Sequence, residues 1–248
     1  MKNHSLKCLI AVILLAMAVI PVSAAENPDD AYLKDNPYIE EEEANASPAI
    51  ADPLEPWNRV MFHFNDKLYF WVLKPVAQGY KAVTPDIVRV GVKNFFHNLG
   101  APIRIVNCLL QGKSEALGVE LGSFMVNTVV GVLGFGNPAA NDPRLKPHDE
   151  DFGQTLAVYG VGDGFYIIWP FLGPSTLRDS VAMGGDHFLA PLSYLNSTEA
   201  SAGIKFYDIV NSTTFRIGDY ESLKEAAVNP YEAFRNAYIQ YRQRKIKE

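Results

Sequence analysis

Apolar residues along most of this chain recur at helical spacing and not in alternation. With an advance of about 100° per residue, the segment Trp57–Leu73 carries its apolar side chains in two stripes on opposite sides of one helix. A surface helix of a soluble protein has one apolar face, so two faces indicate a helix inside a core or a helix that contacts both protein and lipid. By itself the pattern favours the core. The first stripe is Trp57, Val60, Met61, Phe64, Leu68, Trp71 and Val72, and the second is Phe62, Tyr69 and Leu73.

Further helices follow, separated by proline and glycine. Pro75 predicts a break or kink, because proline removes a helical hydrogen bond. Gly184 and Gly185 predict the end of a later helix. Alternation of period two is missing, so strands are poorly supported throughout. These signals predict an all-α fold with helices over Ile87–Leu99 (capped by Thr84), Ile103–Gln111, Glu115–Val130, Thr176–Met183, Ser201–Ile217, Tyr220–Ala227 and a final helix that starts at Asn229-Pro230.

One glycine-rich segment interrupts this pattern in the middle of the chain. Gly131–Pro147 is a long connection rich in Gly, Pro, Asn and Asp. A connection of this length inside a compact domain is usually functional or disordered. Phe135 stands between Gly134 and Gly136, which predicts an apolar tip on a hinge.

A second interruption lies between Asp151 and Asp179. Asp151 predicts the cap of a short helix, which the following glycines end. Phe165–Trp169 is an apolar run too short for a buried helix, so it predicts a buried extended piece. Ser175 is predicted to be the N-cap of the next helix.

The N-terminal residues have the pattern of a secretory signal. Lys2 and Lys7 precede a 12-residue apolar core, Leu9–Ile20, and small residues follow as far as Ala25. The apolar run is too short to span a bilayer comfortably, which favours a cleaved signal over an uncleaved anchor. We therefore expect a signal peptide at 1–25, an acidic disordered linker at 26–51 and a helical domain at 52–248.

Charge is distributed unevenly along the chain. The stretch from Glu26 to Asp52 holds nine of the 28 acidic residues and one base, Lys34, with few large apolar residues. The remainder after Asp52 carries 19 acidic and 19 basic residues. A neutral body lacks the concentrated basic surface that nucleic acid requires, so no nucleic-acid partner is expected.

The two cysteines exclude an internal disulfide in the processed chain. Cys8 lies before the apolar core and would be removed with the signal. Cys108 is then alone, and its apolar neighbours predict an inert core thiol and not a nucleophile.

Candidate chemistry in the chain is weak. The four consecutive side chains of His148–Asp151 cannot all point at one metal ion, and no further His or Cys lies nearby at ligand spacing. Ser175 lacks the Gly-x-Ser-x-Gly setting of a nucleophile. Arg178 and Asp179 are expected to form an ion pair that locks a turn. We therefore expect no catalytic residue, no metal and no cofactor.

Three longer signatures resemble the VacJ/MlaA family. Together they cover about Asp52 to Arg244, nearly the whole predicted domain. They are Asp52-Pro53-Leu54-Glu55-Pro56-Trp57-Asn58-Arg59 with Phe62-x-Phe64-Asn65, then Asp151-Phe152-Gly153-Gln154-Thr155-Leu156 with Pro170–Asp179, and Asn229-Pro230-Tyr231 with Arg235, Ala237, Tyr238 and Gln240.

The resemblance implies a fold and a role. The fold is a ring of amphipathic helices around a central channel, with one glycine-rich non-helical segment, lying in the periplasmic leaflet of the outer membrane. The role is to remove mislocalised phospholipids from the outer leaflet and pass them to a soluble periplasmic carrier, which maintains lipid asymmetry. Trimeric porins are the membrane partners that the resemblance implies, and no covalent chemistry is involved.

Two sets of site residues follow from the resemblance and the pattern. The lipid-channel or gating set is Gly131, Gly134, Phe135, Gly136 and Pro138. The membrane or packing set is Trp57, Phe62, Phe64, Tyr69 and Trp71.

Two questions stay open at this point. Family members are commonly lipoproteins, whereas this chain lacks a Cys directly after the apolar core, so attachment through the apolar perimeter and a porin is expected, with a partly periplasmic protein as the alternative. A periplasmic lipid hydrolase that uses Ser175 or an Asp, and a structural envelope interaction protein, are the alternative functions.

Overall fold

The computed structural model describes residues 50–145 and 148–248, which lie within one compact unit. The predicted signal peptide and all but the end of the predicted linker lie outside the described residues. Helices dominate, as the apolar spacing predicts. They are α3 (Glu55–Leu68), α4 (Lys74–Val83), α5 (Asp86–Leu99), α6 (Ala101–Leu110), α7 (Ser114–Val129), α8 (Phe152–Val158), α9 (Leu177–Leu189), α10 (Thr198–Thr213), α11 (Asp219–Ala226) and α12 (Pro230–Lys247).

Of the two outcomes predicted for Pro75, a break or a kink, the break does not occur. The helix α3 continues through a π-helical segment, η2 (Tyr69–Leu73), directly into α4, and Pro75 lies in the first turn of α4. The Lys74 amide donates to the Tyr69 carbonyl, five residues back. This π turn shifts the hydrogen-bond register by one residue just before the proline, so the chain remains helical across it.

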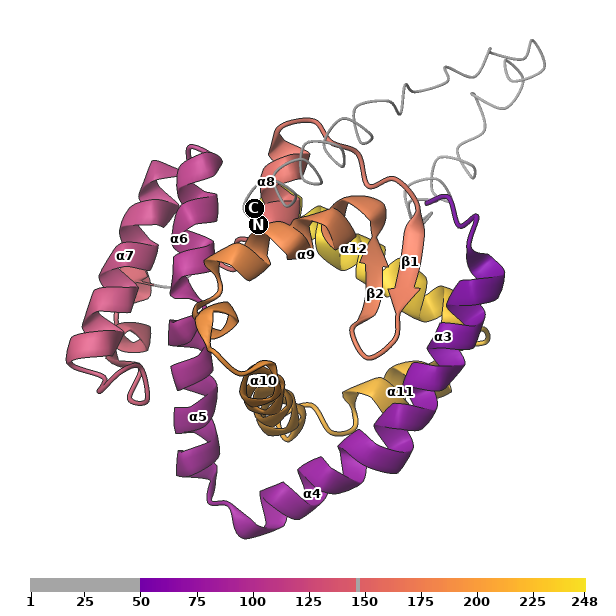
Figure 1. The fold of residues 1–248 in the computed structure, drawn as a ribbon, viewed down its shortest axis with the longest axis horizontal. Coiled ribbons are helices and arrows are strands. Elements are labelled where there is room, and N and C mark those ends of the chain that lie inside the picture. The colour runs from indigo at the N-terminus through magenta and orange to yellow at the C-terminus, as the bar shows by residue number, and fades with distance from the viewer. Residues whose placement is uncertain (1–49, 146–147) are drawn as a thin grey trace, which may run out of the picture. The chain divides into compact units, whose positions relative to one another are not determined.

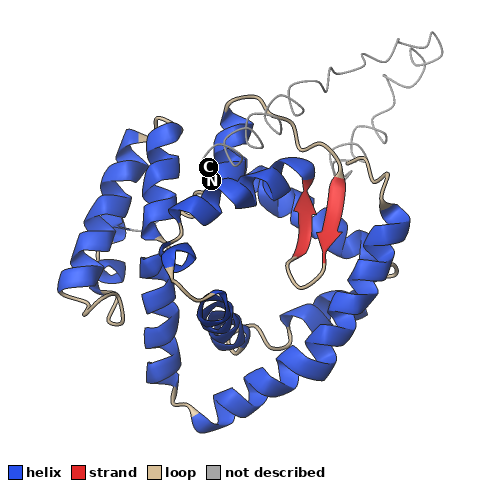
Figure 2. Cartoon of the chain, viewed as in Figure 1, coloured by secondary structure: helices blue, strands red, loops and turns tan. Residues whose placement is uncertain are grey.

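Strands, which the sequence supports poorly, occur only as one short hairpin among the described residues. A hairpin pairs β1 (Tyr166–Trp169) with β2 (Gly173–Thr176) in antiparallel register (Figure 2). Tyr166, Ile167 and Ile168 are buried in succession, so this short strand shows no alternation from which it could be predicted. The prediction of a buried extended piece holds for those three residues.

Two boundaries around α9 differ from the expected ones. Ser175 lies in β2, and the N-cap is Thr176, whose Oγ1 accepts from the Asp179 amide at 3.1 Å. The helix then runs through Gly184 and Gly185 to Leu189. A Cβ on Gly185 would lie 2.6 Å from the Phe152 ring, so this glycine permits α8 and α9 to pack closely and does not end the helix.

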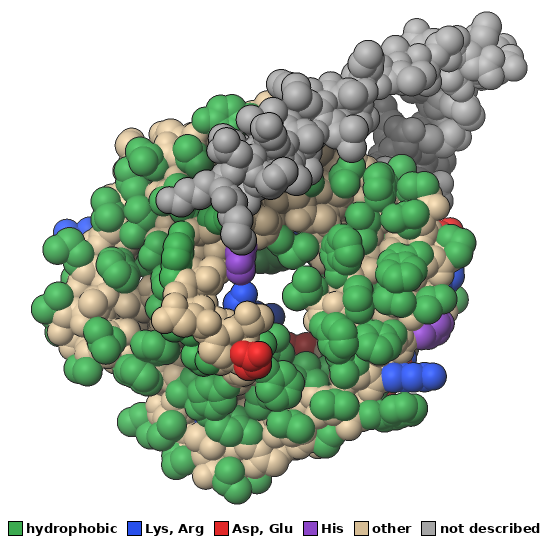
Figure 3. All heavy atoms as spheres, in the orientation of Figure 1, with side chains coloured by type: hydrophobic (Ala, Val, Ile, Leu, Met, Phe, Trp, Pro, Cys, Tyr) green, Lys and Arg blue, Asp and Glu red, His purple; other side chains and the backbone are tan. Residues whose placement is uncertain are grey.

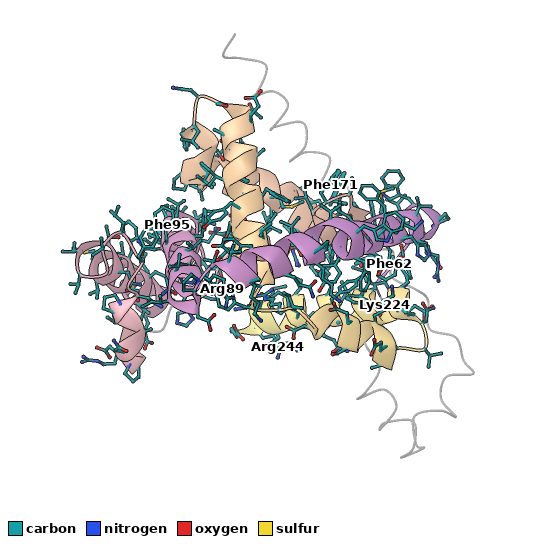
Figure 4. All side chains as sticks on the ribbon, turned by 90° about the horizontal axis from the view of Figure 1, so that it is seen from below. Phe62, Arg89, Phe95, Phe171, Lys224 and Arg244 are labelled. Atoms are coloured by element: carbon teal, nitrogen blue, oxygen red, sulfur yellow. The ribbon has the colours of Figure 1, made fainter. Side chains whose placement is uncertain are left out.

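The elements follow one another around the centre of the unit in Figure 1, where the space-filling view of Figure 3 shows a hollow. α3, η2, α4, α5 and α6 form one side of the perimeter, and α9 and the hairpin complete it. Contacts close this circuit: α4 packs on α10, α10 on α5, α5 on α6, α6 on α9, α9 on β2, and β1 on α3. α10 is seen end-on in Figure 1 and stands upright in Figure 4, so it lies across the plane of the other helices.

The apolar core of this unit is small. One cluster joins the hairpin to the last helix, with Tyr166, Ile168, Tyr231 and Ile239 as its buried members. Among the described residues, the buried polar and charged side chains outnumber the buried apolar ones. Polar contacts therefore hold many of the helices together, and most large apolar side chains lie elsewhere.

Candidate functional site

The two apolar stripes of the first helix have different environments. Trp57, Phe64 and Trp71 recur every seven residues and form an exposed line, and Trp71 is 73% exposed. Phe62 and Tyr69 face the protein instead. Phe62 packs edge-on against Tyr231 at 6.0 Å between ring centroids, and the Tyr69 hydroxyl donates to Glu221 at 3.0 Å. The core interpretation is therefore wrong for the exposed members of the first stripe, although Met61 of that stripe packs against the buried cluster. The membrane or packing set divides into three exposed and two packed residues.

Exposed apolar side chains continue along the neighbouring helices. Val83 and Ile87, at the α4–α5 corner, are 81% and 82% exposed. Val129 and Val130, at the end of α7, are also largely exposed. Figure 3 shows hydrophobic side chains over most of the visible face, which is hollowed at its centre. Contiguous apolar surface of this extent on a protein normally contacts a membrane or another protein.

Two asparagines that sequence reasoning missed attach the hairpin to α3. Asn58 is fully buried; its Nδ2 donates to the Tyr166 carbonyl at 3.0 Å and its Oδ1 accepts from the Ile168 amide at 2.7 Å. Two turns later, Asn65 Nδ2 donates to the Trp169 carbonyl at 2.9 Å and Asn65 Oδ1 accepts from the Phe171 amide at 2.9 Å. Their spacing of seven places both on one helix face, a signal that was present between the apolar stripes.

A buried ionic network holds α8, α9 and α12 together. Arg242 lies 2.5 Å and 2.9 Å from the two carboxylate oxygens of Asp151 and 3.0 Å from Asp179 Oδ1. Arg178 pairs with Asp179 at 3.0 Å, as the sequence predicts, and also with Asp163 at 2.8 Å. A Cβ on Gly153 would lie 2.4 Å from Asp179 Oδ1, which explains the glycine in this signature.

The glycine-rich loop forms a compact structure on α5 and α7. Gly134 has φ 98°, and a Cβ there would lie 2.4 Å from the Asn98 side chain. A Cβ on Gly131 would lie 2.5 Å from the Asn127 carbonyl and 2.7 Å from the Pro138 ring. Both glycines are therefore required by close approach. Gly136 donates its amide to the Gly131 carbonyl at 2.8 Å, which closes the loop on itself.

Phe135 lies against α5 and is not a free tip. Its ring stacks on Phe95 at 4.9 Å between centroids, and its Cδ1 would lie 3.4 Å from a Cβ on Gly91. It remains 45% exposed. Val132 and Leu133, next to it in the loop, are more exposed and take positive φ values of 52° and 59°. Branched and bulky residues with positive φ are strained, so the loop stores backbone strain at its apolar tip.

Asparagines anchor this loop, and sequence reasoning missed them too. Asn127 donates to Asn137 Oδ1 at 3.0 Å and accepts from the Ala139 amide at 3.0 Å. Asn98 donates to the Leu133 carbonyl of the loop at 3.4 Å and to the Thr128 hydroxyl of α7 at 3.0 Å. Both are buried, so each contributes hydrogen bonds shielded from water. Neither is marked by a sequence motif, because its loop partners come from elsewhere in the chain.

An open pocket of about 570 Å³ lies between η2, α10, α11 and α12. Its apolar side combines rings and aliphatic side chains, and its polar side includes one basic and one acidic residue. The lining residues are Tyr69, Ile209, Ser212, Thr213, Arg216, Asp219, Tyr220, Leu223 and Phe234.

The run His148–Asp151 is dispersed among different partners. Glu150 pairs with Lys113 at 2.8 Å, and Asp151 caps α8 by accepting from the Gln154 amide at 2.9 Å, as expected. Among the residues that the structure describes, no group of three His, Cys, Asp or Glu side chains could hold a metal ion.

Ser175 and Cys108 have environments that do not suit nucleophiles. The Ser175 hydroxyl is buried within reach of the Thr176 carbonyl at 3.2 Å and the Ser180 hydroxyl at 3.0 Å, neither of which is a general base. Cys108 is fully buried, and burial raises the pKa of its thiol to about 11, which keeps it protonated.

Asp186 predicts a pH dependence of stability. Burial raises the pKa of Asp186 to about 6 from an ordinary value of 3.8, against hydrogen bonds from the Phe152 amide and Asn107. Between about pH 4 and 6 the folded chain binds a proton that the unfolded chain does not, so stability falls as pH rises. Thermal unfolding is measured for wild type and Asp186→Asn at pH 4.5 and at pH 7. From the lower to the higher pH, the Tm of wild type should fall relative to the Tm of the variant. An equal difference at both pH values would contradict this assignment.

None of the helices within residues 50–145 and 148–248 combines the length and the apolar content needed to cross a bilayer.

Known proteins resemble this chain along most of its length. The family model described as MlaA lipoprotein matches residues 50–245. The intermembrane phospholipid transport system lipoprotein MlaA of Escherichia coli K12 is 36% identical over 193 residues, which are 77% of this chain and 76% of that protein. The MlaA of Haemophilus influenzae is 30% identical and covers 79% of this chain and 80% of its own length.

A solved structure agrees with these relatives. It comes from work on the structural basis for maintenance of bacterial outer membrane lipid asymmetry, and it matches with a TM-score of 0.71 and 33% identity. The match covers 79% of this chain and 99% of the solved chain. Because family model, relatives and fold coincide, this chain belongs to the MlaA lipoprotein family.

Proposed function

We propose that this chain is an outer-membrane component of intermembrane phospholipid transport, which removes phospholipids from the outer leaflet through an opening in a helical ring. Its relatives are named for intermembrane phospholipid transport, and the solved structure concerns outer membrane lipid asymmetry, which supports this role. Transfer requires no covalent step, which agrees with the inert settings of Ser175 and Cys108.

The observation that supports the proposal is that polar side chains are buried within the unit while large apolar side chains are exposed on its surface. Buried contacts are rich in charges and amides, such as Arg242 with Asp179, while tryptophan, phenylalanine and valine side chains are exposed. In water this arrangement leaves a large apolar surface unburied. Against lipid tails the same surface needs no protein partner. Apolar surfaces gain little by associating with one another in lipid, so the buried polar contacts hold the helices together instead.

The opening and the glycine-rich loop are the parts that we assign to transport. A headgroup and two acyl chains need polar and apolar surface side by side, and the hollow in Figure 3 is bordered by both kinds of side chain. Gly131, Gly134, Phe135, Gly136 and Pro138 form the adjustable part of this wall in the proposal. The strained φ values of Val132 and Leu133 support a loop with more than one conformation.

Attachment is proposed through the exposed apolar perimeter and a trimeric porin. In Figure 4 Arg244 and Lys224 lie on one side of the unit and Phe171 on the other. Basic residues suit the headgroup level and the periplasm, where a soluble lipid carrier would receive the lipid. Trp57, Phe64 and Trp71 would face acyl chains.

The proposal predicts that purified protein carries phospholipid and that the membrane holds it without ionic contacts. Membrane fractions washed with high salt and with carbonate should retain the protein, because apolar contact is insensitive to salt. Chloroform extraction of the purified protein should release phospholipid. Release by salt alone would refute the apolar attachment, and lipid-free protein would refute transport and favour a structural role.

A lipid hydrolase is the competing function. Incubation of the purified protein with phospholipid should release no fatty acid or headgroup under the proposal. Hydrolysis that disappears in Ser175→Ala would overturn it.

A further inference from the structure

The pocket between η2, α10, α11 and α12 has a continuous aromatic side. Tyr69 and Tyr220 lie 4.7 Å apart between ring centroids, and Tyr220 and Phe234 also lie 4.7 Å apart. Ile209 of α10 and Leu223 of α11 extend this apolar lining. A volume of about 570 Å³ is within the range of small-molecule sites.

One cation and one anion line the same pocket without pairing. Arg216 and Asp219 are linked only through the backbone, where the Asp219 amide donates to the Arg216 carbonyl at 3.2 Å. Within the described residues neither side chain has a hydrogen bond or an ion pair. The charges beside them are satisfied, since Glu221 pairs with Lys74 at 2.6 Å and Asp66 with Lys224 at 2.7 Å.

The pocket lies where a lipid that enters the opening could reach it. In Figure 1 α10 and α11 lie inside the outline of α3 and α4, and in Figure 4 Lys224 of α11 lies on one side of these helices. Tyr69 belongs to that perimeter, while Arg216 lies in the turn between α10 and α11 and Asp219 is the first residue of α11. The pocket therefore connects the perimeter to the helices inside it.

We propose that this pocket binds the headgroup of a zwitterionic phospholipid, with its phosphate at Arg216 and its ammonium at Asp219. A guanidinium presents two parallel donors to phosphate oxygens, and a carboxylate accepts from an ammonium. The faces of Tyr69 and Tyr220 add favourable cation–π contact with the ammonium. Ile209, Leu223 and Phe234 contact the first carbons of the acyl chains. This inference rests on the proposed function and deepens it by naming the headgroup class.

The arrangement discriminates between headgroups. A lipid with a phosphate but no ammonium would satisfy Arg216 and leave Asp219 facing a net negative charge. Specificity is a difference between affinities, and a like charge at the site lowers the affinity for the wrong lipid. Phosphatidylethanolamine should therefore bind more tightly than phosphatidylglycerol with the same acyl chains.

The two charges can be tested separately in the full-length protein. Purified protein is equilibrated with mixed detergent micelles that contain equal amounts of the two lipids, and bound lipid is quantified by mass spectrometry. Arg216→Gln should lower the binding of both lipids about tenfold, as expected for a lost charge-assisted hydrogen bond. Asp219→Asn should lower only the binding of phosphatidylethanolamine, so the ratio of bound phosphatidylethanolamine to bound phosphatidylglycerol should fall about fivefold. Lys81→Gln, which removes an exposed cation of α4 outside the pocket, is the control and should change the binding of neither lipid.

A second arm distinguishes a lipid from a soluble phosphate compound. Free phosphoethanolamine should compete only at concentrations far above those of the lipid, because it lacks the acyl contacts. Competition at equal concentration would assign the pocket to a soluble phosphate and overturn the inference. An unchanged lipid ratio in Asp219→Asn would also overturn it while phospholipid still binds. Absence of any phospholipid on wild type would instead contradict the proposed function itself.

Discussion

Phospholipid transfer should stop when the glycine-rich loop is fixed to α5 by a disulfide, and should resume when the bond is reduced. The pair Gly91→Cys and Phe135→Cys suits this experiment, because a Cβ built on Gly91 lies 4.0 Å from the Phe135 Cβ. Native disulfides have Cβ–Cβ distances of about 3.5–4.5 Å, so the bond can form in the observed conformation. If the opening is adjusted by this loop, the bond removes every other conformation. Transfer from vesicles to an acceptor protein is measured before and after addition of a thiol reductant.

Three comparisons make this result specific to the loop. The double variant is made in a Cys8→Ser, Cys108→Ala background, so that no other thiol can pair. Each single cysteine variant should transfer lipid at one rate with or without reductant. Since Phe135→Cys also deletes the ring that stacks on Phe95, the reduced double variant sets the reference rate. Equal rates in the oxidised and reduced double variant would refute a moving loop and leave the transport function in place.

Replacement of Arg242 by methionine should lower Tm by about 10 °C. Arg242 is 7% exposed and bridges Asp151 and Asp179, which come from separate elements. Removal of one partner leaves two carboxylates close together in a poorly solvated site, which costs about 3–5 kcal/mol. For a domain of this size 1 kcal/mol corresponds to about 2–4 °C in Tm. Differential scanning fluorimetry of the detergent-purified protein measures the shift.

A neighbour on the same helix supplies the control. Arg244→Met removes an exposed charge two residues away and should leave Tm nearly unchanged. Gly153→Ala tests the same network from the other side, because its Cβ would lie 2.4 Å from Asp179 Oδ1 and 2.6 Å from Arg242 Nη2. A Tm for Arg242→Met equal to that of Arg244→Met would show that the buried network does not hold α8, α9 and α12 together.

Sequence reasoning predicted the helices well because their signals are local. The stripes of α3, the cap at Asp151 and the pair Arg178–Asp179 depend on residues within a few positions of one another. The errors have a tertiary cause. Gly185 has the local pattern of a helix end, but the helix continues there because Phe152 of α8 packs against this glycine. β1 is a strand because its backbone forms hydrogen bonds with the Asn58 side chain and with β2.

The candidate site was predictable to a similar extent. The glycines of the loop and the exposed tryptophans were chosen from the sequence, and the structure explains Gly131 and Gly134 by close approach. Asn98, Asn127 and the pair Arg216–Asp219 were missed. An isolated polar residue on a helix has the same local pattern whether it faces solvent, a loop or a pocket.

The amino-acid sequence by itself determined the family, the helical class and the presence of two apolar faces on the first helix, because motifs and periodicity are properties of neighbouring residues. Only the tertiary structure decided which face packs and which is exposed. That choice depends on Tyr231 reaching Phe62 and Glu221 reaching Tyr69 across more than 150 residues, whereas Trp71 remains 73% exposed. Such long-range pairings follow from how the whole chain closes on itself, and no local pattern encodes them.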